Sequence, residues 1–349
     1  MPRDIPVGNG DLLINFDESY RVRDLYYPHV GRYNHTAGHV QRFGVWADGQ
    51  FAWIEDASWE RHLAYRPNSL VTEVRLVSRK LELELVCNDV VDFHEPVYLR
   101  RILVRDKRAN GHHGDTPPPP RDVRIFMHID LSIKESPVGD TCDFDPETNG
   151  LVLYKDDSYF LVNAVDGGEV GIDHWAIGTK RVGGAEGTWR DAEDGVLGRN
   201  AISQGSVDAT VGVNLSVPPK GEGVVAIWLA CGDSYERVRE LNRVIQAKSV
   251  DRMIARTEAY WKLWTRKDLQ GAAVASAPTD PTVVANPLAA LTPRVRELFM
   301  SSQLILRTQV DNRGAIIAAT DSDISHFAGD HYAYCWPRDG ALVAHALIL

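Results

Sequence analysis

The chain has 349 residues, of which 44% are hydrophobic and 25% charged, and its formal net charge is −10. These proportions are ordinary for a soluble globular protein with a large core, and the length suggests about two domains. The acidic balance argues against nucleic acid as the main partner, because a phosphate backbone requires a basic protein face.

The sequence shows no targeting, membrane or metal signal. The opening MPRDIPVGNG lacks the apolar segment of a signal peptide, and no run of about 18 apolar residues predicts a membrane helix. The four cysteines are scattered without a C-x-x-C pair, which argues against a zinc site or a redox motif. They could form two disulfides, but without an export signal we expect reduced thiols. We therefore expect a cytoplasmic protein without membrane or metal contacts.

Residues 1–232 have the pattern of β-structure. In Lys80–Phe93 leucines alternate with glutamates, which predicts a strand with one solvated face. Gly150–Val165 predicts two strands joined at Lys155–Ser158, and Thr210–Gly232 predicts another pair around Pro218–Gly223. Because no helical period alternates with these strands, the pattern favours antiparallel sheets packed as a sandwich.

Two polar stretches within this region have alternative interpretations. Asp89, Asp92 and Glu95 lie close together and suggest a cation site, but solvated acids at a strand end are the favoured interpretation. The Tyr26–His35 loop is rich in Tyr, His and Asn. The loop has three possible roles: it reaches a ligand pocket, it docks on the helical part of the chain, or it only packs around a turn at Gly31.

Helical periodicity begins after Gly232. Ser234 is a candidate N-cap. The first helix is expected to bury one stripe of residues: Val238, Leu241 and Ile245. The second helix has a comparable side: Met253, Thr257, Tyr260, Trp261 and Trp264. The composition of Leu269–Pro287 predicts an extended connector.

A third helix should open with Thr292 as N-cap and Pro293 at its first position. Its predicted stripe comprises Val295, Leu298, Ser302, Ile305 and Gln309. We predict three parts: a β-sandwich over 1–232, a helical linker and connector over 233–287, and a further helical part over 288–349.

The densest chemistry lies in the closing segment, HYAYCWPRDGALVAHALIL. Asp339 is either an N-cap of the following helix or a ligand for a bound molecule. An arginine fork beside a carboxylate, as in Arg338–Asp339, grips vicinal hydroxyls through charge-assisted hydrogen bonds. Tryptophan and tyrosine add apolar walls with polar tips. Such a combination suits an uncharged polyhydroxyl ligand such as a sugar.

Two segments resemble glycoside hydrolase family 15, which holds glucoamylases, glucodextranases and some trehalases. GAIIAATDSDI (Gly314–Ile324) followed by DHYAYCWPRDGALVA (Asp330–Ala344) is similar to the start of its catalytic domain. Ile5–His39 is similar to the N-terminal domain of prokaryotic members. The resemblance implies a mainly β fold: a large antiparallel β-sandwich, linker helices, and the first helices of an incomplete (α/α)6 barrel.

The resemblance also implies roles for four residues. Arg338 and Asp339 match the pair that binds hydroxyls of the non-reducing-end glucose, Trp336 matches an aromatic wall, and Tyr332 matches a tyrosine near the reacting sugar. Family members invert the anomeric centre with two glutamates, an acid and a base. No glutamate follows Glu297, so we expect no catalytic residue in this chain, which would be a truncated product or a fragment.

The expected parent reaction is hydrolysis of a terminal α-glucosidic bond, without a cofactor, in an α-glucan or α-glucoside substrate. The sequence leaves open whether the linkage is α-1,4, α-1,6 or α-1,1, and it leaves the oligomeric state open. Two alternatives remain: a non-catalytic carbohydrate-binding or interaction module, and part of a two-domain glycoside phosphorylase.

Overall fold

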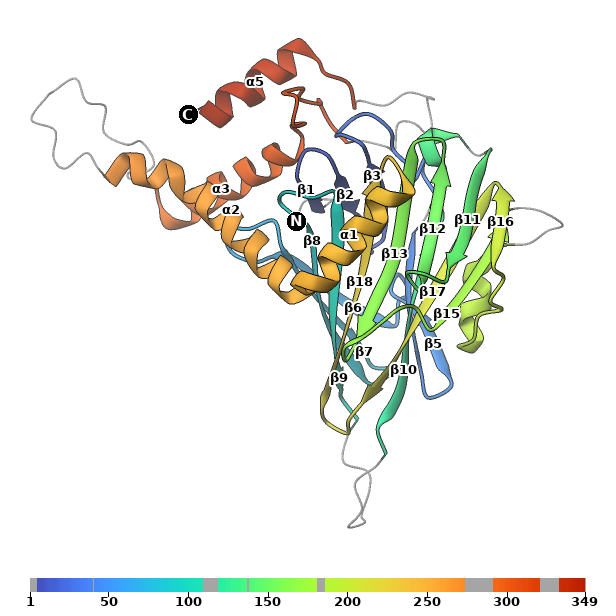
Figure 1. The fold of residues 1–349 in the computed structure, drawn as a ribbon. Coiled ribbons are helices and arrows are strands. Elements are labelled where there is room, and N and C mark those ends of the chain that lie inside the picture. Colours follow the sequence, from blue (N-terminus) through green and yellow to red (C-terminus); the bar gives the residue numbers. More distant parts are fainter. Residues whose placement is uncertain are drawn as a thin grey trace, which may run out of the picture.

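The computed structural model describes residues 5–39, 41–108, 119–136, 138–180, 186–273, 291–320 and 333–348. Within them the fold is mainly β, with three antiparallel sheets followed by helices (Figure 1). The smallest sheet has the order β1-β2-β3 and comprises β1 (Ile5–Gly8), β2 (Leu13–Phe16) and β3 (Val22–Tyr26).

Two larger sheets form the sandwich. The five-stranded sheet has the order β15-β17-β10-β4-β5 and comprises β4 (Arg42–Ala47), β5 (Gln50–Trp53), β10 (Arg121–Ile129), β15 (His174–Thr179) and β17 (Val207–Val217). The ten-stranded sheet comprises β6 (Trp59–Tyr65), β7 (Thr72–Ser78), β8 (Leu83–Val91), β9 (Val97–Asp106), β11 (Asp140–Asp145), β12 (Gly150–Lys155), β13 (Ser158–Asp166), β14 (Glu169–Val170), β16 (Ile202–Gly205) and β18 (Glu222–Gly232).

The helical elements complete the layers. They are the 3-10 helices η1 (Ile133–Glu135) and η2 (Thr188–Asp194) and the α-helices α1 (Tyr235–Lys248), α2 (Val250–Ala273), α3 (Pro293–Thr308) and α5 (Pro337–Ile348). Helix α1 lies across β13 and β18 (Figure 1). None of the helices in the described ranges is long and apolar enough to cross a membrane.

The main core lies between the two large sheets. On β10 the inward residues Ile125 and Ile129 alternate with outward-facing side chains, as the strand period of two requires. They share one buried cluster with Val211 of β17 and Ile102 of β9. The sandwich predicted from the sequence is therefore present.

The opposite face of the ten-stranded sheet is covered by α1 and α2. Leu99 and Trp228 of the sheet pack with Leu241 of α1 and Met253 of α2, all of them buried. The predicted stripe of α1 is confirmed, and the Ser234 hydroxyl accepts a hydrogen bond from the Arg237 backbone N–H as its cap. Burying an amphipathic face in this way is what stabilises a helix in a globular protein.

Two strand predictions were wrong in detail. The segments around Pro218–Gly223 do not pair with each other: β17 pairs with β10 and β15, whereas β18 pairs with β13 and β9. Their turn instead carries the chain from one sheet to the other, so that both strands face the same core. The expected solvated face of β8 is also absent at Glu84, which is 5% exposed and pairs with Arg75 and Lys107.

Two of the acids expected at a solvated strand end, Asp89 in β8 and Asp92 directly after it, are buried and paired rather than solvated. Asp89 is 0% exposed and accepts hydrogen bonds from Arg100, Tyr98 and Tyr20 at 2.7, 2.5 and 2.5 Å. Asp92 is 0% exposed and forms a fork-to-carboxylate pair with Arg256. Each arginine supplies the charge that a cation would have supplied. No three His, Cys, Asp or Glu side chains in the described part could hold a metal ion.

The helical part differs from its prediction in two places. Helix α2 continues to Ala273, so the start of the expected connector Leu269–Pro287 is helical; the remainder lies outside the described residues. On α3 the buried residues are Met300, Gln303, Leu304 and Thr308. The predicted stripe residues Val295 and Leu298 are 45% and 67% exposed, because α3 packs through Leu304 against Trp261 of α2. The Thr292 cap and Pro293 at the helix start are confirmed.

Candidate functional site

The Tyr26–His35 loop docks on the segment between α3 and α5. Tyr26 and Val30 form a small buried cluster with Ile317 and Ala333. Gly31 has a φ of +82°, and a Cβ there would lie 2.5 Å from Ile317 Cγ2 and 2.9 Å from the Ala333 carbonyl oxygen. A glycine is therefore needed both for the backbone conformation and for the close approach. Of the three alternatives, this contact supports docking.

A second contact holds the end of α3 to the turn between β1 and β2. Arg307 donates hydrogen bonds to the Asn9 carbonyl and to Asn312 Oδ1, at 3.4 and 3.1 Å. The Ala318 N–H donates to the Tyr334 carbonyl at 3.0 Å, which places the closing motif beside this docked segment. The N-terminal sheet thus positions the residues that precede α5.

Three of the four predicted sugar-binding residues lie at the start of α5, and the fourth, Tyr332, lies outside the described residues. Trp336 is 45% exposed. The side chains of Arg338 and Asp339 are 81% and 36% exposed, with Arg338 Nη2 3.5 Å from Asp339 Oδ2. The two charged groups are thus adjacent and open to a ligand.

Asp339 is not an N-cap. Helix α5 begins at Pro337, and the Gly340 N–H donates to the Trp336 carbonyl at 2.8 Å. Proline suits the first helical position because its missing N–H would have no helical partner there. Asp339 therefore lies in the first turn, where its charge complements the helix dipole without closing the helix end.

A polar cavity of about 330 Å³ lies elsewhere, at one end of the outward face of the five-stranded sheet. Its walls come from β4, β10, β17, the end of β15 and η2. Its lining residues are Gly38, His39, Arg42, His128, Asp130, Lys180, Glu186, Gly187, Trp189 and Asp208. The sequence analysis did not single out any of these residues.

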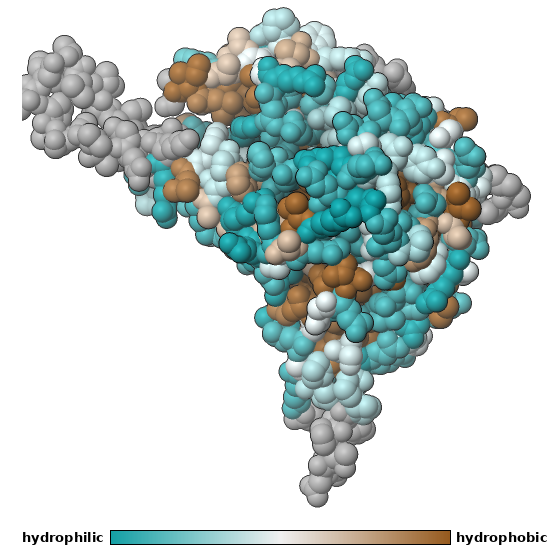
Figure 2. Space-filling model, in the orientation of Figure 1, coloured by the Kyte–Doolittle hydropathy of each residue, from teal (hydrophilic) through white to brown (hydrophobic). Residues whose placement is uncertain are grey.

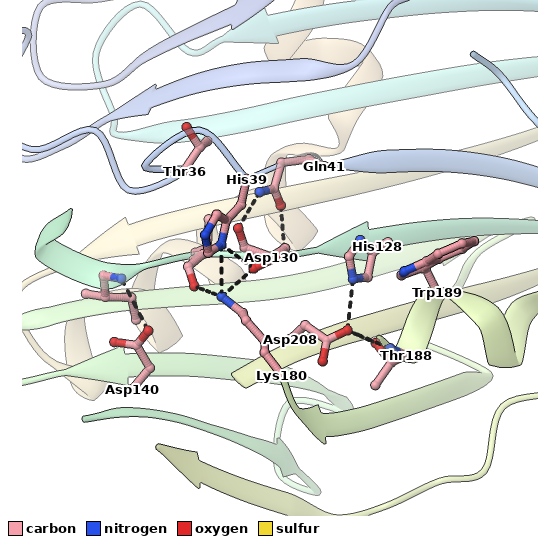
Figure 3. Close-up of polar contacts among 12 residues, drawn as sticks. Thr36, His39, Gln41, His128, Asp130, Asp140, Lys180, Thr188, Trp189 and Asp208 are labelled. Carbon is pink, nitrogen blue, oxygen red and sulfur yellow. Dashed lines mark hydrogen bonds and ion pairs between the residues drawn. The ribbon is translucent and has the colours of Figure 1, made fainter. Parts of the chain in front are cut away.

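Two hydrogen-bonded groups organise the cavity (Figure 3). In the first, Asp130 Oδ1 lies 2.8 Å from His39 Nδ1 and forms an ion pair with Lys180. Lys180 also donates to the Leu131 carbonyl at 2.6 Å. Burial alone would raise the pKa of the Asp130 carboxyl, but the hydrogen bonds from His39 and Lys180 and the charge of Lys180 outweigh burial and lower it.

In the second group, Asp208 Oδ2 lies 2.9 Å from His128 Nε2 and accepts hydrogen bonds from the N–H and hydroxyl of Thr188 (Figure 3). Burial favours the neutral acid, yet the His128 and Thr188 interactions lower the pKa of Asp208. Both cavity aspartates are therefore carboxylates at neutral pH.

One sequence pattern could have revealed this site: side chains along a strand alternate between its two faces. On β10 and β17, Ile129 and Ala209 face the sandwich core, so that His128 and Asp208 face outward. An outward polar residue on a strand is ordinarily solvent-exposed. Only the packing of η2 over this face turns these two residues into a buried pair.

Comparison with known proteins supports the fold. No family model and no curated protein matches the chain. A solved structure of a bacterial glucoamylase complexed with acarbose matches 89% of this chain at a TM-score of 0.65 and 13% identity. The match covers 41% of that chain, so this chain spans less than half of its length. At this identity the likeness shows the fold alone: large antiparallel sheets followed by helices.

A polysaccharide lyase structure matches 67% of this chain and 34% of its own, at 8% identity. Its TM-score of 0.40 is too low to support an argument.

Proposed function

We propose that this chain is the N-terminal portion of an inverting α-glucoside hydrolase of family 15 that acts on terminal α-linked glucose. The observation that carries the proposal is the likeness to a bacterial glucoamylase over 89% of the chain. The residues that resemble the family motif lie at the start of α5, after α1, α2 and α3. The substrate class would be starch-type or isomalto-oligosaccharides, or trehalose.

In this proposal Arg338 and Asp339 bind vicinal hydroxyls of the terminal glucose, and Trp336 forms an apolar wall. Their exposure of 81%, 36% and 45% leaves them accessible to a sugar. Tyr332 keeps the role that the resemblance implies for it. Inversion requires two carboxylates on opposite faces of the sugar ring, and we assign neither to these 349 residues. The helices from α3 onward would belong to an (α/α)6 barrel.

The test combines turnover with sugar binding. The purified chain should release no glucose from maltotriose, isomaltose or trehalose, since acid–base catalysis alone contributes about 10²–10⁴-fold. Ligand-observed NMR should detect binding of at least one of these sugars. Asp339→Asn should weaken that binding by about 10- to 150-fold, the value of one charge-assisted hydrogen bond.

The control for the substitution is the melting temperature, which should stay unchanged because the Asp339 side chain is partly exposed. Equal sugar binding by wild type and Asp339→Asn would contradict the role of Asp339 and of its neighbour Arg338. Glucose release at the usual enzyme rate of about 10 per second would contradict the absence of catalytic residues, and phosphate-dependent turnover would favour a phosphorylase.

A further inference from the structure

We propose that the polar cavity on the outer face of the five-stranded sheet is a second binding site, for a short neutral saccharide. This site does not depend on the role proposed for Trp336, Arg338 and Asp339. It lies on the face of the sandwich opposite to the layer formed by α1 and α2. The proposal rests on incomplete hydrogen bonding, charge, rigidity and size.

The buried side chains of the cavity are incompletely hydrogen-bonded. His128 and Asp208 are 3% and 1% exposed. His128 Nδ1 and Asp208 Oδ1 have no hydrogen-bond partner within the described part of the chain. Buried polar atoms are normally paired, because an unpaired one costs folding free energy. Unpaired atoms of this kind also occur at buried side chains outside the cavity, such as Trp53 and Trp261. The case for a ligand therefore depends mainly on the accessible side chains of Arg42 and Asp130.

The charges of the lining disfavour a phosphate-like anion and a bare metal ion. Arg42 and Lys180 contribute two positive charges, and Asp130, Glu186 and Asp208 three negative ones, so the sum is 2 − 3 = −1 with neutral histidines. A phosphate would face three carboxylates, and a metal ion would face two fixed cations. A sugar avoids both conflicts, because each hydroxyl donates to a carboxylate and accepts from a cation.

Asp130 and Arg42 have hydrogen-bonding capacity left for such hydroxyls. The contacts of His39 and Lys180 both reach Asp130 Oδ1, which leaves Oδ2 available within the described part of the chain. Arg42 uses Nη1 for Glu55, at 2.5 Å. The Arg42 side chain is 27% exposed and that of Asp130 21%, so both are accessible. Together they present a cationic fork and a carboxylate to the cavity.

The cavity is held rigid around these two residues. Gln41 clamps the Asp130 backbone by donating to its carbonyl at 2.6 Å and accepting from its N–H at 2.7 Å (Figure 3). The Arg42 guanidinium lies 4.4 Å from the Trp189 ring centroid, which fixes it beside an apolar wall. Groups fixed before binding lose little conformational entropy when a ligand arrives.

The size of the cavity limits the ligand. Its volume of about 330 Å³ lies at the lower end of the usual range of about 300–1,000 Å³ for small-molecule pockets. This volume suits a short saccharide, and we choose maltose as the probe.

The experiment is a maltose titration of the whole chain with its histidine side chains isotope-labelled for NMR. The imidazole signals of His39 and His128 should shift saturably, whereas that of the 75%-exposed His94 should not. Arg42→Met should weaken maltose binding at this site by about 10- to 150-fold, as expected for one charge-assisted contact. Inorganic phosphate at the same concentrations should shift neither cavity histidine.

The matched control is Arg124→Met. Arg124 lies on the same outward face with its guanidinium 4.3 Å from the Trp46 ring, as Arg42 lies over Trp189, but it does not line the cavity. Maltose binding at this site should be unchanged in Arg124→Met and also in Asp339→Asn, which separates this site from the one proposed at α5. If Arg42→Met does not fold, Asp130→Asn replaces it with the same expected loss.

Three results would each overturn the proposal. The first is that maltose does not shift the cavity histidines, and the second is that phosphate shifts them in its place. The third is that the Arg42→Met and Arg124→Met variants bind maltose equally well.

Discussion

Two arginine–aspartate pairs illustrate how the sandwich and the C-terminal helical part differ. Arg100–Asp89 lies inside the sandwich with side chains 2% and 0% exposed, whereas Arg338–Asp339 lies at the start of α5 with side chains 81% and 36% exposed. Tyr20, Tyr98 and Thr72 also donate to Asp89, so its acceptor sites are filled by the fold. The same two residue types therefore hold the fold together in one region and face solvent in the other.

The packing of leucines shows the same contrast. Leu241 of α1 is 0% exposed, whereas Leu298 of α3 and Leu342 of α5 are 67% and 66% exposed. Figure 2 shows hydrophobic side chains at the surface over α5, and no residue of α5 is buried. We therefore expect the sandwich, together with α1 and α2, to contribute most of the stability. The closing motif, with its proposed ligand contacts, lies in the less tightly packed part.

The largest expected loss of stability is found when the aspartate of each pair is replaced by asparagine and the two variants are compared. Asp89→Asn should lower the free energy of unfolding by about 3–5 kcal/mol, because it leaves Arg100 buried without its counter-ion. Asp339→Asn should change it by less than about 1 kcal/mol, as usual for an exposed pair. Urea unfolding followed by tryptophan fluorescence measures both. Equal effects would remove the distinction between the two pairs.

A leucine in each region gives the next test. Leu241→Ala should destabilise the chain by about 2–5 kcal/mol, since it opens a cavity beneath α1. Leu298→Ala should stay within about 0.5 kcal/mol, because the side chain is already 67% exposed. Thermal unfolding of the two variants under one buffer condition makes the comparison. A loss of more than 2 kcal/mol at Leu298 would show that α3 is packed on that face.

Acid should destabilise the Tyr26–His35 loop, which packs between the two regions. Burial is the main cause that lowers the pKa of His35 from 6.5 to about 4, and the neutral ring donates from Nε2 to the Tyr27 carbonyl. Because the pKa of His35 is lower in the folded than in the unfolded chain, the neutral ring contributes about 3 kcal/mol to the free energy of unfolding. This contribution is fully present above pH 6.5. It is lost as the pH falls from 6.5 towards 4.

The measurement is urea unfolding at pH 7.5 and pH 4.5. His35→Gln keeps a donor for the Tyr27 carbonyl and should lose most of the difference between the two pH values, whereas His94→Gln, at a side chain 75% exposed, should keep it. An unchanged pH dependence in His35→Gln would place the acid sensitivity elsewhere.

The smallest expected loss of stability comes from the contact of Gly31 with Ile317 and Ala333. Gly31 and Gly49 have nearly equal φ values of +82° and +86°, but nothing lies within 4 Å of a Cβ at Gly49. Gly49→Ala should therefore cost only backbone strain of about 1 kcal/mol. Gly31→Ala should cost about 1–2 kcal/mol more, through its clash with Ile317 and Ala333. Hydrogen exchange of Ala315–Ala318 should rise only in Gly31→Ala if the loop holds this segment.

The sequence by itself determined most of the secondary structure and the mainly β fold followed by helices. The turn at Lys155–Ser158 and the caps Ser234 and Thr292 are local signals, and each appears in the structure where the sequence placed it. Of the alternating leucines, Leu83 and Leu85 lie in β8, whereas Leu81 lies in the turn before it. The division at 232 and 287 and the sugar-binding roles near Asp339 stay predictions. The sugar-binding roles depend on contacts with a ligand, and the division into domains depends on which parts of the chain fold independently.

Tertiary structure alone decided which polar residues are buried together. The sequence placed Asp89 and Asp92 at a solvated strand end, but Arg100 lies on the neighbouring strand β9 and Arg256 on α2, far along the chain. His128 and Asp208 are likewise 80 residues apart and meet only because β10 and β17 pair. Local patterns reveal the period of a strand or helix, whereas burial and charge pairing depend on which surface packs over it.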